Sequence, residues 1–237
     1  KHGITQTTLK SYFSNIVDEY QETLTGTTTL PAEKMKKVWL WTWYTSMMDA
    51  NGFTQVITRY LNKRHNVPFE QFYEYLLDWG LANEQAVAHK WLKKWQAYGD
   101  KLEFNMFLAG MTYAPVMEDL GVTNRTKAFE DIMTVARHFA PEDPLLLDVM
   151  IMQERQQTSY EHPPTTEITL GANVFEYALG KEELVIRPTK YKIHRRYPFK
   201  DTNPTWVQWM NTKRKNKGWQ AQVEYSTEKT TLFLEKG

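Results

Sequence analysis

The chain of 237 residues contains no cysteine. Disulfides, zinc thiolate sites, iron–sulfur ligation and cysteine nucleophiles are therefore excluded within this chain. No apolar run approaches the roughly 20 residues that a membrane-spanning helix needs, so we expect no membrane span. The N-terminus also lacks the charged and then apolar regions of a signal peptide, and this favours a cytoplasmic location.

The sequence also lacks the short motifs that identify common reactions. It has no Gly-x-Gly-x-x-Gly, no phosphate-binding Gly-x-x-x-x-Gly-Lys-Ser/Thr, no Gly-x-Ser-x-Gly and no His-Glu-x-x-His. None of the six histidines has another histidine three to five residues away, so no metal site is predicted. An enzyme that acts by itself would have to use an acid–base site that leaves no local motif.

The composition is typical of a folded protein, with 41% hydrophobic and 14% aromatic residues. Apolar residues recur at helical spacing through the first 160 residues, and Pro, Gly and Asn interrupt them. This pattern predicts helices over 9–20, 32–49, 53–62, 68–80, 83–95, 124–139 and 145–157.

The pattern changes after Pro163-Pro164, where apolar and polar residues alternate. The alternation predicts an antiparallel sheet with strands over 166–170, 183–187, 191–195, 219–225 and 230–234, and a short helix over 206–213. We therefore expect an α+β fold, with a mainly helical region followed by a small C-terminal antiparallel α/β unit. Residues 1–162 would form the helical domain and residues 163–237 the small domain.

Charge divides the chain at nearly the same place. Residues 181–237 hold 13 Lys or Arg and 6 Asp or Glu, a net charge of +7, whereas the other 180 residues have a net charge of −6. A basic segment of this kind could bind nucleic acid or an acidic partner, or it could form a solvated face. One hypothesis is therefore a stand-alone adaptor whose basic C-terminal segment binds such a partner.

Aromatic residues are concentrated near residue 40, where Trp39, Trp41, Trp43 and Tyr44 fall within six positions. They could stack on a ligand, and they could equally pack between helices. Arg59 lies on an apolar helix. It could hold a carboxylate or phosphate through its planar guanidinium, or it could occupy the exposed flank of that helix.

Three stretches of the chain follow one another in an order that resembles a known family. The first covers residues 43–61 around the turn Asn51-Gly52-Phe53 and continues into Pro68-Phe69-Glu70-Gln71-Phe72. The second is Leu145-Leu146-Leu147-Asp148, which leads to Pro163-Pro164. The third runs from Leu170 through residues 175–177 and 191–193 to Trp206-Val207-Gln208-Trp209, after which Met210-Asn211-Thr212 departs from the pattern.

Together these stretches resemble the C-terminal region of cobalamin-binding radical S-adenosylmethionine enzymes. The resemblance implies a part that caps the mouth of the radical barrel and shapes the substrate pocket. The parent enzyme would use S-adenosylmethionine, a 4Fe-4S cluster and cobalamin, and it would often transfer a methyl group. Because the chain has no cysteine, it cannot hold the cluster, and we expect it to bind none of these cofactors alone.

On this interpretation the partners of the chain are the cobalamin-binding and barrel domains, with no membrane involved. Because the first residue is Lys1 and not Met, we expect a removed segment or a longer parent chain. The residues we would examine first for substrate binding are Trp41, Tyr44, Arg59 and Tyr73, as an aromatic wall and an anchor for an anion. No catalytic residue and no metal ligand is predicted.

Overall fold

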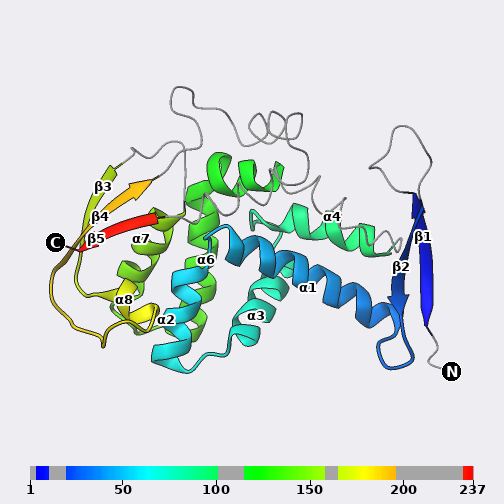
Figure 1. Cartoon of the computed structure of the whole chain (residues 1–237), viewed down its shortest axis with the longest axis horizontal. Coiled ribbons are helices and arrows are strands. Elements are labelled where there is room, and N and C mark those ends of the chain that lie inside the picture. The colour runs from blue at the N-terminus through cyan, green and yellow to red at the C-terminus, as the bar shows by residue number, and fades with distance from the viewer. Residues whose placement is uncertain (1–3, 11–19, 101–114, 158–164, 196–231, 237) are drawn as a thin grey trace.

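The computed structural model describes residues 4–10, 20–100, 115–157, 165–195 and 232–236. Its helices pack together in the middle of the molecule, with a β-hairpin at one end and a small sheet at the other (Figure 1). The expected α+β class, mainly helical with a small antiparallel unit in the C-terminal part, is confirmed. Within the described residues, no helix combines the length and apolar character that a bilayer span requires.

Six of the seven predicted helices are present, but the one predicted over 83–95 begins only at residue 89 and ends at residue 100, because residues 84–88 form turns. The helices are α1 (Ala32–Ala50), α2 (Gln55–His65), α3 (Phe69–Ala82), α4 (His89–Asp100), α6 (Arg125–Phe139) and α7 (Leu146–Gln156). Two short elements were not predicted, a π-helical segment η1 (Asp119–Thr123) before α6 and the helix α8 (Val174–Ala178).

The prediction of a helix over 9–20 is wrong, because the described residues at both ends of this range lie in strands. Strand β1 (Thr5–Lys10) pairs antiparallel with strand β2 (Tyr20–Gly26), so that Leu9 faces Gln21 and Lys10 faces Tyr20. Both strands are rich in threonine, whose branched Cβ favours extended backbone over helix. Residues 11–19 lie outside the described residues.

The C-terminal sheet consists of β3 (Thr165–Leu170), β4 (Thr189–Arg195) and β5 (Leu232–Lys236), in the antiparallel order β3-β4-β5. The strands predicted over 166–170 and 191–195 are confirmed, and the last strand begins two residues later than predicted. The helix predicted over 206–213 and the strand predicted over 219–225 lie outside the described residues.

The strand predicted over 183–187 is wrong, because no strand forms there. Val185 instead bonds to Asn173, which lies just before α8. The Val185 backbone N–H donates to Asn173 Oδ1 at 2.7 Å, and the Val185 carbonyl accepts from the Asn173 N–H at 3.3 Å. The Val185 backbone groups are already hydrogen-bonded to Asn173, and Pro188 has no N–H to donate to a neighbouring strand. Residues 183–187 therefore cannot form a continuous series of strand hydrogen bonds.

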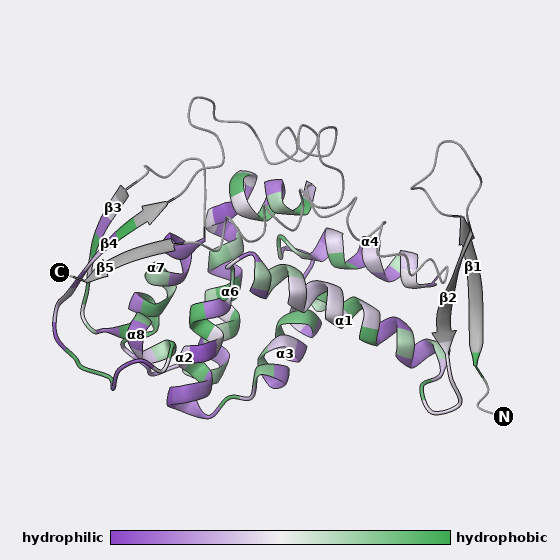
Figure 2. Ribbon diagram, in the orientation of Figure 1, coloured by the Kyte–Doolittle hydropathy of each residue, from purple (hydrophilic) through white to green (hydrophobic). Residues whose placement is uncertain are grey.

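The core is one cluster of buried side chains that runs from α1 through the other helices to β3 and β4. Phe53, Tyr60, Phe72 and Tyr191 are among its largest fully buried members. Figure 2 shows hydrophobic and hydrophilic residues mixed along the same helices, as amphipathic helices require. The division into domains at residues 162 and 163 stays a prediction, since the cluster includes residues on both sides of it.

The turn between α1 and α2 depends on a residue far along the chain. Gly52 in this turn has a φ of 72°, in the left-handed region that glycine adopts without strain. Gln153 of α7 is fully buried against the turn. Its Oε1 accepts the N–H groups of Val56 and Ile57 at 2.6 and 3.1 Å, and its Nε2 donates to the Gly52 carbonyl at 2.5 Å. These bonds satisfy donors that the first turn of α2 leaves without helical partners.

Candidate functional site

The four residues chosen from the sequence fall into two groups. Trp41 and Tyr44 lie on α1, Arg59 on α2 and Tyr73 on α3. Tyr44 is 2% exposed and lies in the core, where burial raises its pKa above the usual value. Trp41 is half-buried against the same core, and its indole N–H has no hydrogen-bond partner among the described residues. The structure therefore does not bring Trp41 and Tyr44 together with Arg59 and Tyr73.

Arg59 and Tyr73 line one open hollow of about 440 Å³ at the junction of α1, α2 and α3. Thr45 and Asp49 of α1 and Phe69 of α3 also line it. Phe69 is 43% exposed, so the hollow presents an apolar ring beside polar groups. Ligand sites commonly combine an apolar wall with a few polar groups in this way.

The Tyr73 hydroxyl joins all three helices around this hollow. It lies 2.9 Å from the Thr54 hydroxyl and donates to Asp49 Oδ1 at 3.1 Å. Burial, followed by the nearby Asp49 carboxylate, raises the pKa of Tyr73, so its hydroxyl keeps its proton at neutral pH. The phenol therefore fixes the position of the Asp49 carboxylate at the edge of the hollow.

Arg59 is the cation among the residues that line the hollow. Its Nη1 donates to the Gln55 carbonyl at 3.3 Å, one turn earlier in α2, and this contact holds the side chain along the helix. The guanidinium keeps further N–H groups that could take a carboxylate or phosphate. The Thr45 hydroxyl is buried in the wall, and no described residue forms a hydrogen bond with it. The hollow can thus offer a cation, a carboxylate and an aromatic ring to one ligand.

A cluster around Asp143 was not predicted from the sequence. Three donors from α2 meet on its Oδ2: the Tyr60 hydroxyl at 2.8 Å, Arg64 Nε at 3.0 Å and His65 Nε2 at 2.6 Å. Its Oδ1 accepts the Leu145 N–H at 2.9 Å, and its side chain is 1% exposed. Burial alone would raise the pKa of Asp143, but the hydrogen bonds from His65, the Leu145 N–H and Tyr60 outweigh it and hold the pKa below its usual value.

The Asp143 cluster resembles the His–carboxylate pairs of catalytic sites, but its three side-chain donors converge on one oxygen of a buried carboxylate. Such an arrangement fixes the end of α2 against the loop before α7, and we interpret it as a structural anchor. Its partners are 78 to 83 residues apart in the chain. No local motif could have revealed them.

A second buried carboxylate, Asp119, lies in the π-helical segment η1. It accepts from Trp91 Nε1 and Asn124 Nδ2, each at 2.6 Å, and its Oδ2 lies 2.8 Å from Lys90 Nζ. Burial acts to raise the pKa of Asp119, but the bonds from Lys90, Trp91 and Asn124 lower it overall. This carboxylate ties α4 to the turn that precedes α6.

The donor set does not fit an iron–sulfur cluster, because the chain has no cysteine. In the ranges that the structure describes, no three His, Asp or Glu side chains gather as a metal site would need. The basic segment of the adaptor hypothesis is described only at residues 181–195 and 232–236, so its central part lies outside the description.

The chain matches no model of a known protein family and no curated protein sequence.

Proposed function

We propose that this chain is the substrate-capping region of a larger cobalamin-dependent radical S-adenosylmethionine enzyme, of methyltransferase type, and has no catalytic activity alone. Its partners would be the cobalamin-binding and barrel domains of that enzyme, which would hold the cobalamin, the S-adenosylmethionine and the cluster. A cytoplasmic location is part of the same proposal.

One observation supports this proposal more than any other. Arg59 was chosen from the sequence as a cation on an apolar helix and Tyr73 as part of an aromatic cluster, and both line the same hollow. The turn Asn51-Gly52-Phe53 of the first stretch leads into α2, which carries Arg59. A capping part needs a concave polar surface on rigid helices, and the hollow at α1, α2 and α3 meets that need.

In this proposal Arg59 anchors an anionic group of the substrate, and Asp49 accepts from a donor group of the same molecule. Phe69 covers an apolar part of the substrate. The chain's own role is to bind and orient the substrate and to exclude water. The radical chemistry would be supplied entirely by the cofactors of the other domains.

The first experiment is to sequence the gene upstream of the Lys1 codon. An open frame of several hundred codons that encodes Cys-x-x-x-Cys-x-x-Cys supports the proposal. A start codon directly before Lys1, with no such protein co-purifying, contradicts it. Salt-dependent binding of DNA or RNA in that case would favour the adaptor hypothesis.

The second experiment uses the whole enzyme and compares Arg59→Gln with Arg137→Gln, an exposed arginine on α6. We expect Arg59→Gln to raise KM by about tenfold, since one charge-assisted contact is lost. Cleavage of S-adenosylmethionine in the absence of substrate should be unchanged in both variants. Equal KM values for the two variants would show that the hollow does not bind substrate.

A further inference from the structure

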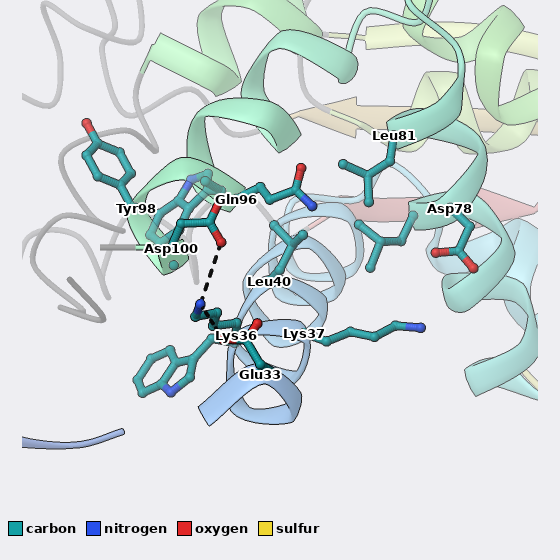
Figure 3. Close-up of a pocket in the computed structure, with 13 residues that line it drawn as sticks. Glu33, Lys36, Lys37, Leu40, Asp78, Leu81, Gln96, Tyr98 and Asp100 are labelled. Carbon is teal, nitrogen blue, oxygen red and sulfur yellow. Dashed lines mark hydrogen bonds and ion pairs between the residues drawn. The ribbon is translucent and has the colours of Figure 1, made fainter. Parts of the chain in front are cut away.

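A second hollow, separate from the one that holds Arg59, lies between α1, the end of α3 and α4 (Figure 3). It has a volume of about 310 Å³. Its apolar lining comes from Leu40, Leu77, Leu81 and Trp95. Ligand pockets span about 300–1,000 Å³, so this hollow lies at the small end of that range and suits a molecule of amino-acid size.

Trp95 gives this hollow a rigid aromatic wall. The Trp95 ring packs against the Trp43 ring with 4.5 Å between centroids, and only 6% of the Trp95 residue is exposed. The indole N–H of Trp95 is buried and has no hydrogen-bond acceptor among the described residues.

The charged residues of this hollow differ in how they are used. Lys36 Nζ lies 2.7 Å from Glu33 Oε1 and 3.8 Å from Asp100 Oδ1, so its charge is already balanced. Lys37 and Asp78 also line the hollow, and neither makes an ion pair with another described residue. Figure 3 shows Lys37 extending from α1 on the side of the hollow where Asp78 projects from α3. One cation and one anion are thus available at the same side of an apolar cavity.

We propose that this hollow binds a small zwitterion of the α-amino-acid type with an aromatic side chain. Lys37 would take the carboxylate, and Asp78 would take the ammonium group. The aromatic ring would lie against the apolar lining of the hollow, in which Leu81 is half-buried and therefore accessible, because apolar contact favours the ring over water. This site goes beyond the proposed function and does not depend on it.

The test measures binding of L-phenylalanine to the whole chain by isothermal titration calorimetry, with three matched probes. Phenylalaninamide lacks the carboxylate, 3-phenylpropionate lacks the ammonium group and L-alanine lacks the ring. We expect L-phenylalanine to bind with a dissociation constant below about 1 mM. Loss of either charged group from the probe should weaken binding about tenfold, and L-alanine should not bind measurably.

Two variants assign the charges to their groups. Lys37→Gln should weaken binding of L-phenylalanine about tenfold and leave phenylalaninamide unchanged, because that probe has no carboxylate for Lys37. Asp78→Asn should weaken binding of L-phenylalanine about tenfold and leave binding of 3-phenylpropionate unchanged, because that probe has no ammonium group for Asp78. Lys34→Gln on α1 and Glu74→Gln on α3 are matched controls, because both are exposed and line neither hollow.

The proposal fails if L-phenylalanine does not bind the chain at millimolar concentration. It also fails if L-phenylalanine binds equally well to Lys37→Gln and Asp78→Asn, since the molecule then binds elsewhere. Equal weakening of all probes by one variant would point to a general change in the fold and would likewise overturn the assignment. Circular dichroism of each variant provides the check on folding.

Discussion

Replacement of Gln153 by leucine tests the most consequential contact in this fold. Gln153 of α7 is fully buried and makes three hydrogen bonds to the backbone at the start of α2, to Gly52, Val56 and Ile57. Leucine has a similar size but can neither donate nor accept. The variant therefore keeps the volume of the side chain and removes all three bonds together.

The expected loss follows from counting those bonds. A hydrogen bond contributes about 1 kcal/mol net, and a buried polar group left without a partner costs about 1–3 kcal/mol. Two N–H groups and one carbonyl lose their partner in Gln153→Leu, so we expect the free energy of unfolding to fall by about 3–5 kcal/mol. Gln156→Leu, on the same helix, is the control. Gln156 is half-buried and its side chain makes one hydrogen bond, to Gln55 at 3.1 Å, so we expect a loss of about 1 kcal/mol or less.

Urea unfolding followed by far-ultraviolet circular dichroism measures both variants. Native-state hydrogen exchange adds a local readout, because the amides of Val56 and Ile57 should lose protection in Gln153→Leu before the rest of the core does. If both variants lose the same stability and the two amides keep their protection, α2 does not depend on Gln153 and the reasoning is refuted.

Three further predictions concern other buried groups. Asp143→Asn should lower the free energy of unfolding by about 2–3 kcal/mol near pH 7. The lowered pKa of Asp143 means that its contribution is complete above the unfolded pKa of about 3.9 and is lost as pH falls through the lower folded pKa, so the difference from the unaltered chain in urea unfolding should shrink progressively as pH falls below 3.9. Burial raises the pKa of four tyrosines, which are Tyr44, Tyr60, Tyr73 and Tyr191. The free energy of unfolding should therefore fall as pH rises above the unfolded tyrosine pKa of about 10. Phenolate absorbance should then appear together with the loss of helical circular dichroism. Separate steps in those two signals would contradict this. Gly80→Ala would place a Cβ 2.8 Å from Leu92 Cδ1 in the packed contact of α3 with α4. We expect thermal unfolding to show a loss of about 1–2 kcal/mol in the free energy of unfolding. Unchanged stability would mean that the Leu92 side chain moves freely.

The helices that carry the proposed substrate hollow were predictable because their signals are local. The apolar spacing of α1, together with Pro31 before it and Gly52 after it, gave its bounds to within one residue. The hairpin was not predicted, because the apolar residues over 9–20 have helical spacing and only pairing between β1 and β2 makes the extended form favourable. Strand pairing is a contact between segments, and the helical period of one segment does not report it.

The residues of the hollow were only partly predictable for the same reason. Arg59 and Tyr73 stood out singly, as a cation on an apolar helix and as part of an aromatic cluster. Their meeting with Asp49 and Thr45 depends on how three helices pack. Tyr44 was chosen by the same aromatic criterion and lies in the core, which shows that aromatic density alone does not separate a ligand wall from packing.

Both ends of α2 are held by residues that come after α6 in the chain. Gln153 binds the backbone at its first turn, and Asp143 binds the Tyr60, Arg64 and His65 side chains toward its last turn. Apolar burial alone would allow α2 to slide along its axis as long as its apolar face stayed inward. The hydrogen bonds at its two ends are directional, and they fix one position along that axis. Arg59 lies between the two anchors, so its place at the hollow depends on both. The sequence therefore specifies this site through polar contacts made across about 80 to 100 residues, and a change at either anchor should alter the hollow without touching any residue that lines it.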